Sequence, residues 1–127
     1  MTDSVDRLYQ AVLAAKHEDP ATSRTSRLLN AGRAKMAKKL GEEAFEVVID
    51  ALHGNREAVV RESADLLYNL VVLWVASGVD PKDVWKEMDR RERLFGIAEK
   101  IPKDMMPPPS SRRKVVALET RRARKRR

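Results

Sequence analysis

The feature that most limits how this chain can fold is a long apolar run in its second half. The run LLYNLVVLWVA, residues 66–76, is apolar nearly all round a helix, so it belongs in a protein interior. A membrane-spanning helix needs about 20 apolar residues, whereas this run is shorter, contains Asn69 and follows Glu62 and Asp65. The run therefore predicts a buried helix in a protein with no membrane partner.

Residues that begin and end helices divide the chain into four predicted helical segments. Gly54-Asn55 supplies a C-cap glycine and then an N-cap, and Asp80-Pro81 opens the last segment. With 5 glycines, 6 prolines and few aromatic residues, the chain lacks the repeated turns of a sandwich or barrel. The segments run over residues 3–17, 33–53, 56–77 and 81–96, and residues 21–30 are predicted to form a polar connection. These features predict an all-α fold with a four-helix bundle-type core.

The second predicted helix has two apolar sides. One side carries Met36, Leu40, Ala44, Val47 and Ala51, and the other carries Phe45, Ile49 and Leu52. A single helical hairpin cannot cover both sides. We therefore expect a homodimer that completes the four-helix core.

The charge of the chain is concentrated at its C-terminal end. The net charge is +7, but residues 112–127 hold nine Lys or Arg and one acid, so the rest of the chain is close to neutral. Residues 105–111, MMPPPSS, read as a linker. We predict one all-α domain over residues 1–104 and a disordered basic tail over residues 105–127, whose only expected partner is a weakly bound nucleic acid. The absence of cysteine and of a visible secretory signal favours a cytoplasmic location.

Two acidic strips suggest the chemistry. Glu42, Glu43, Glu46 and Asp50 share one sector of the second helix, while Glu62, Asp65 and Asn69 follow i, i+3, i+7 spacing on the third. An antiparallel hairpin turning at Gly54-Asn55 brings the two strips together. Converging carboxylates form a hard-oxygen site suited to Mg²⁺ or Mn²⁺ and to phosphate chemistry. Solvated surface acids are the alternative, although that explanation does not cover acids within an apolar helix.

Positive and hydroxyl side chains lie upstream of the acids. Lys35, Lys38 and Lys39 stand one or two turns before the glutamates, and Thr25, Ser26 and Arg27 precede them in the stretch TSRLL. These six residues are candidates for binding substrate phosphates or ribose. The alternative for the lysines is a solvated basic face.

The stretches KKLGEEAFEVVIDA, residues 38–51, and ESADLLYNLVVL, residues 62–73, resemble phosphoribosyl-ATP pyrophosphohydrolases of histidine biosynthesis, within the all-α, MazG-like nucleotide pyrophosphohydrolases. The motifs EExxE and ExxD are filled by Glu42, Glu43, Glu46, Glu62 and Asp65. The resemblance implies that these five acids hold Mg²⁺, that a nucleotide is cleaved with release of pyrophosphate, and that the enzyme is a dimer. Asn69 is expected to support the ligands from behind.

Two departures from this family bear on the substrate. Arg24 stands where an aromatic residue is expected, and Asn69 stands where His is expected. The alternative functions are a housekeeping nucleoside triphosphate pyrophosphohydrolase with the same acids, and a helical dimer that binds nucleic acid through its tail.

Overall fold

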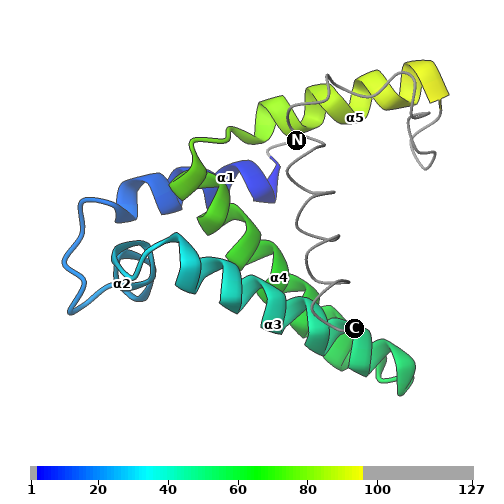
Figure 1. The fold of residues 1–127 in the computed structure, drawn as a ribbon, viewed down its shortest axis with the longest axis horizontal. Helices are drawn as coiled ribbons and strands as arrows, with labels where there is room; N and C mark the ends of the chain where they lie inside the picture. Colours follow the sequence, from blue (N-terminus) through cyan, green and yellow to red (C-terminus); the bar gives the residue numbers. More distant parts are fainter. Residues whose placement is uncertain (1–2, 96–127) are drawn as a thin grey trace, which may run out of the picture. The chain divides into compact units, whose positions relative to one another are not determined.

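The structure, a computed structural model, describes residues 3–95 of the chain. These residues form five helices and no strand: α1 (Ser4–Ala15), α2 (Arg24–Asn30), α3 (Arg33–Leu52), α4 (Arg56–Ser77) and α5 (Pro81–Phe95) (Figure 1). The predicted all-α fold is confirmed. The chain divides into two units, residues 1–86 and 87–127, with the division inside α5. The predicted domain boundary at residue 104, the linker and the basic tail lie outside the described residues.

Local signals in the sequence account for most helix ends. Asp3 caps α1 by accepting the backbone N–H of Val5 at 3.0 Å, and Asn55 caps α4 by accepting that of Ala58 at 3.2 Å. Gly54, with φ of 69°, and Gly78, with φ of 72°, adopt the left-handed conformation that ends α3 and α4. The predicted hairpin of residues 33–53 and 56–77 is therefore present as α3 and α4.

The polar connection predicted over residues 21–30 is wrong, because residues 24–30 form the short helix α2. The Ser23 hydroxyl accepts the backbone N–H of Ser26 at 3.1 Å, which caps the helix. Two adjacent leucines do not establish a helical period, so periodicity misses a helix of 7 residues. Leu28 nevertheless anchors α2 to the core.

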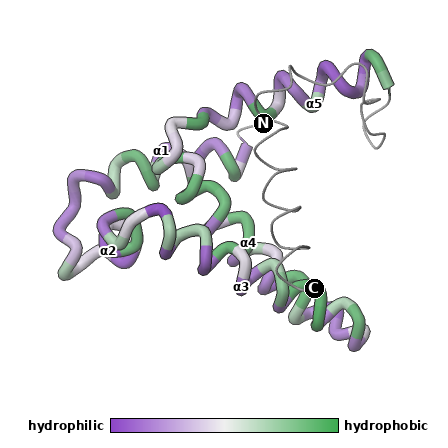
Figure 2. Tube along the Cα trace, viewed as in Figure 1, coloured by the Kyte–Doolittle hydropathy of each residue, from purple (hydrophilic) through white to green (hydrophobic). Residues whose placement is uncertain are grey.

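The core lies where α1, α2 and α3 meet the second half of α4. Its buried members are Val12, Leu28, Met36, Val71, Val72 and Val75. Beyond this core α3 and α4 continue together towards their turn, and Figure 2 shows hydrophobic segments along that end of the hairpin. The buried helix predicted from the apolar run of residues 66–76 is thus confirmed for its second half only, since Leu67 is 46% exposed.

Apolar side chains on the hairpin have no cover within the described part of the chain. Leu52 is 81% exposed, Phe45 65% and Val60 57%. This exposure is what the two apolar sides of residues 33–53 predicted for a single subunit. The homodimer itself stays a prediction.

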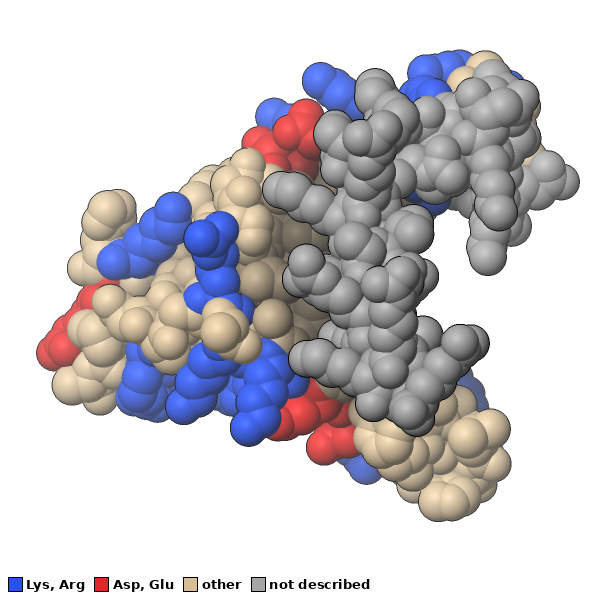
Figure 3. Space-filling model, in the orientation of Figure 1, with Lys and Arg blue, Asp and Glu red and all other residues tan. Residues whose placement is uncertain are grey.

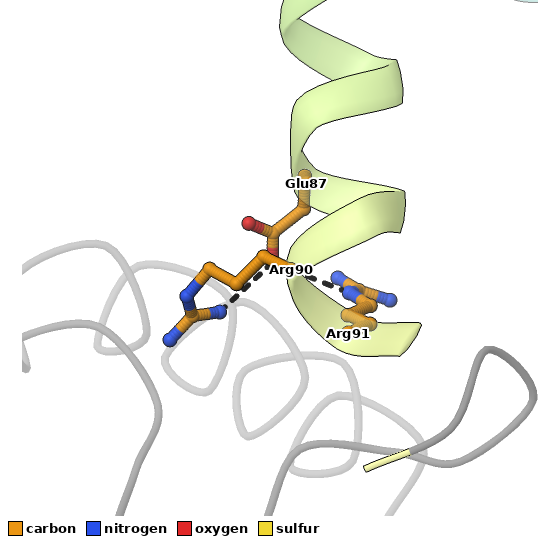
Figure 4. Close-up of polar contacts among 3 residues, drawn as sticks. All are labelled: Glu87, Arg90 and Arg91. Carbon is orange, nitrogen blue, oxygen red and sulfur yellow. Dashed lines mark hydrogen bonds and ion pairs between the residues drawn. The ribbon is translucent and has the colours of Figure 1, made fainter. Parts of the chain in front are cut away.

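The last helix contributes a ring contact and a small ion-pair group. Trp85 meets Trp74 of α4 edge to face, with ring centroids 6.2 Å apart. Further along α5, the Oε1 atom of Glu87 accepts hydrogen bonds from Arg90 and Arg91, each at 3.2 Å (Figure 4). None of the helices in residues 3–95 is long and apolar enough to cross a membrane.

Candidate functional site

Three carboxylates from the hairpin converge on one point. Glu43 lies on α3, and Glu62 and Asp65 lie one turn apart on α4. One oxygen atom of each lies within 4.8 Å of the others, which is a spacing that a single cation can bridge. The predicted meeting of the two acidic strips is confirmed at these residues.

Glu46 extends this group along α3. Its carboxyl shares a hydrogen bond with Glu62, and together with the negative charge of Glu62 this raises the pKa of Glu46 above its ordinary value. Desolvation and the charge of Asp50 act in the same direction, while a hydrogen bond with Glu43 opposes them. The acids therefore repel one another strongly enough to favour a shared proton or a shared cation.

Two buried oxygen atoms beside the acids have no hydrogen-bond partner among the described residues. They are Oε2 of Glu43 and Oδ1 of Asn69. A buried carboxylate oxygen without a donor is costly, and a metal ion is one way to satisfy it. With three carboxylates and few competing cations, the residues fit a hard divalent ion such as Mg²⁺.

Asn69 is buried at 3% exposure one turn after Asp65. Its Nδ2 atom donates to the main-chain oxygen of Asp65 at 2.8 Å. Asn69 was expected to support the metal ligands. In the structure its hydrogen bond is to the backbone of α4, at Asp65, and not to a carboxylate group.

Glu42, the fifth predicted acid, lies outside the three-carboxylate group. It is exposed and approaches Nζ of Lys38 at 4.0 Å. The structure therefore pairs Lys38 with an acid and does not bring it to the other cations.

Four positive side chains surround a pocket of about 260 Å³ between α2 and α3. Arg24, Arg27, Lys35 and Lys39 line this basic pocket, together with Leu28 and Ala31. Figure 3 shows Lys and Arg gathered over α2 and the start of α3, with acids next along the hairpin. Three of the four cations were predicted from the sequence. Arg24 was missed, although its i, i+3 spacing from Arg27 places both on one side of α2 once that helix is recognised.

The two predicted hydroxyl residues have structural partners. Ser26 is fully buried, and its Oγ donates to the carbonyl of Glu18 at 2.8 Å. The hydroxyl of Thr25 shares a hydrogen bond of 2.7 Å with that of Tyr68 on α4. Ser26 thus joins α2 to the preceding loop instead of facing a substrate, while Thr25 joins α2 to α4, the helix that carries Glu62 and Asp65.

Comparison with known proteins places these features in one family. Residues 5–92 match the family described as phosphoribosyl-ATP pyrophosphohydrolase. The chain is 65% identical to phosphoribosyl-ATP pyrophosphatase 2 of Rhodopseudomonas palustris, with all of both chains covered. It is 63% identical to the protein of the same name from Bradyrhizobium diazoefficiens, over 99% of each chain. A phosphoribosyl-ATP pyrophosphatase of Azospirillum brasilense is 52% identical over 76% of this chain and 86% of its own.

Proposed function

This chain belongs to the phosphoribosyl-ATP pyrophosphohydrolase family, and we propose that it hydrolyses phosphoribosyl-ATP to phosphoribosyl-AMP and pyrophosphate in histidine biosynthesis. The observation that carries the proposal is the convergence of Glu43, Glu62 and Asp65 from two consecutive helices. Relatives named for this activity match the chain from end to end. This acidic site is consistent with a hydrolase that acts on a phosphoanhydride bond.

Glu43, Glu62 and Asp65 would hold Mg²⁺, with Mn²⁺ as a possible substitute. Such an ion, when bound, screens the charge of the phosphates and polarises the anhydride that is cleaved. Glu46, predicted from the sequence as a further ligand, lies outside the three-carboxylate group and is hydrogen-bonded to Glu62. We propose that its carboxylate orients the attacking water and receives its proton. Glu42 stays a predicted ligand, which would need its side chain to leave Lys38.

The assembly and location are part of the same proposal. A second copy of the chain would cover Phe45, Leu52 and Val60, whose exposure is costly in water. The cysteine-free composition is consistent with a cytoplasmic enzyme. Weak nucleic-acid contact through residues 105–127 stays a prediction, and those residues lie outside the described part of the chain.

A substrate panel with detection of released pyrophosphate tests the function. We expect kcat/KM for phosphoribosyl-ATP to exceed that for ATP or any common dNTP at least about tenfold, or about 1.4 kcal/mol of transition-state binding. Activity should require Mg²⁺ or Mn²⁺ and disappear with EDTA. Preference for a canonical or damaged dNTP, or failure to restore growth without histidine in a strain lacking this step, would instead indicate a housekeeping pyrophosphohydrolase.

A further inference from the structure

The basic pocket between α2 and α3 has a surplus of positive charge. Arg24, Arg27, Lys35 and Lys39 line it, and no carboxylate does. The ion pairs found within residues 3–95 join Lys38 to Glu42 and Glu87 to Arg90 and Arg91, so none neutralises a pocket cation. Four like charges around one cavity repel each other unless an anion enters it.

Both arginines of the pocket are held in place before any ligand arrives. The guanidinium of Arg24 lies over the Tyr68 ring, 5.8 Å from its centroid, and Arg27 donates from Nη1 to the carbonyl of Pro20 at 3.0 Å. The hydroxyl of Tyr68 is in turn bonded to Thr25 at 2.7 Å. A guanidinium has five N–H donors, so each arginine keeps donors that can bind a phosphate. Such preorganisation lowers the entropy cost of binding an anion.

The pocket begins beside the acids and extends away from them along α3. Lys39 precedes Glu43 by one helical turn, about 6 Å along the axis, and Lys35 precedes it by about 12 Å. Tyr68, which supports Arg24, lies one turn after Asp65 on α4. An anion in the pocket is therefore separate from the phosphates cleaved at the acids, yet close enough to belong to the same molecule.

The lining favours a phosphate attached to a sugar. Leu28 and Ala31 form the apolar part of the pocket, which suits the carbon face of a ribose and offers nothing to bare pyrophosphate. Phosphoribosyl-ATP carries two anionic ends, the triphosphate and the phosphate monoester of the added ribosyl group, on opposite sides of the adenine. We propose that the basic pocket binds this phosphate monoester and thereby selects phosphoribosyl-ATP over ATP. This inference rests on the function proposed above.

The first test compares substrates. In Arg24→Gln and Lys35→Gln, the ratio of kcat/KM for phosphoribosyl-ATP to that for ATP should fall at least about tenfold, the expected effect of losing one charge-assisted hydrogen bond. Arg33→Gln is the matched control, because it removes a positive charge from α3 outside the basic pocket. Lys35 is exposed, so its variant should keep the helical circular-dichroism spectrum even if Arg24→Gln disturbs Tyr68. If Lys35→Gln leaves the ratio of the two kcat/KM values unchanged, the proposal is overturned. This holds whether kcat/KM falls equally for phosphoribosyl-ATP and ATP or falls for neither.

The second test needs no turnover. Ribose 5-phosphate, added to the full-length protein at millimolar concentration and followed by NMR, should shift resonances of α2 and the start of α3, whereas ribose should not. Lys35→Gln should weaken this binding at least about tenfold, again the loss of one charge-assisted contact. No binding by the wild type, or equal binding by both proteins, overturns the proposal. If ribose 5-phosphate binds as expected but the wild type does not prefer phosphoribosyl-ATP, the proposed function fails while the phosphate site stands.

Discussion

Replacing Glu62 by Gln should stabilise the metal-free protein and remove the stabilisation that Mg²⁺ provides. One oxygen of Glu62 lies within 4.8 Å of oxygens of Glu43 and Asp65. Two unit charges at that separation repel by about 0.9 kcal/mol in water and about 3.5 kcal/mol at an effective dielectric constant of 20. Because Asp65 is exposed, the value for water applies. Salt at about 0.1 M reduces it by roughly two fifths.

The substitution removes the repulsions of Glu62 with Glu43 and Asp65, in addition to that with Glu46, so the free energy of unfolding should rise by at least about 1 kcal/mol and Tm by about 4–8 °C or more in EDTA. The amide oxygen of Gln can still accept a hydrogen bond from protonated Glu46, and the amide nitrogen can donate one to ionised Glu46. With Mg²⁺ at 100 times its Kd, by contrast, the wild type should gain about 2.7 kcal/mol, a gain that the variant largely lacks. The order of the two melting temperatures should therefore reverse between the two conditions.

Thermal unfolding followed by circular dichroism, in EDTA and in excess Mg²⁺, measures both effects. Glu57→Gln is the matched control, since it removes an exposed acid from the same helix outside the three-carboxylate group. It should lower Tm by a few degrees at most, because Glu57 lies in the first turn of α4, and it should keep the full response to Mg²⁺. The reasoning is refuted if Glu62→Gln melts below the wild type in EDTA, or if it gains as much from Mg²⁺ as the wild type does.

Four other outcomes follow from the structure. Asp65→Asn should lower kcat/KM for phosphoribosyl-ATP at least about 100-fold with helicity intact, and near-normal turnover with normal metal dependence would exclude Asp65 as a ligand. Leu52→Glu places a charge on a side chain that is 81% exposed in one subunit, so sedimentation should show monomers where the wild type is dimeric; a wild type that sediments as a folded monomer contradicts the predicted dimer. Because the pKa of Glu46 is raised above 4.5, the folded state favours its protonated form, and the stability it contributes is present at lower pH and lost as the pH rises through the raised value. Glu46→Gln should thus melt above the wild type at neutral pH in EDTA and match it in acid, and a pH-independent difference would argue against the shift. Removing residues 110–127 should leave folding and metal-dependent turnover largely unchanged, because the family match ends at residue 92, and a truncated protein that unfolds would show that the predicted tail packs on the domain.

The main hairpin could be predicted from the sequence because its signals are local. Gly54 and Asn55 mark the turn with residues that suit a left-handed C-terminus and an N-cap, and both adopt those roles. Once the turn is known, equal spacing from it places Glu46 opposite Glu62, and the structure joins their carboxyl groups. Register along paired helices follows from sequence distance, so the acids could be matched without coordinates.

The surroundings of the acids could not be predicted as well, since they depend on contacts between distant segments. Helix α2 is short and polar, so its sequence has no hydrophobic periodicity that would predict the burial of Ser26 against the loop at Glu18. Glu42 and Glu43 are neighbours in the same motif, and only the packing of α4 decides that Glu43 turns inward. The sequence identified Arg24 as a departure from the family. Its position in the basic pocket could not be predicted, because that position depends on α2 being a helix.

The two halves of the acidic site stand on consecutive helices joined by a short turn, which affects how the protein folds. Helices that pair with their neighbour in sequence make contacts of low contact order and form early. Closing the hairpin of α3 and α4 therefore brings Glu43 against Glu62 and Asp65 while like charges still oppose the step. A divalent cation bound by these acids would offset this repulsion, because binding free energy at such a site is also folding free energy. We therefore predict that the proposed Mg²⁺ ion, besides its role in hydrolysis, stabilises the closed hairpin that forms its own binding site.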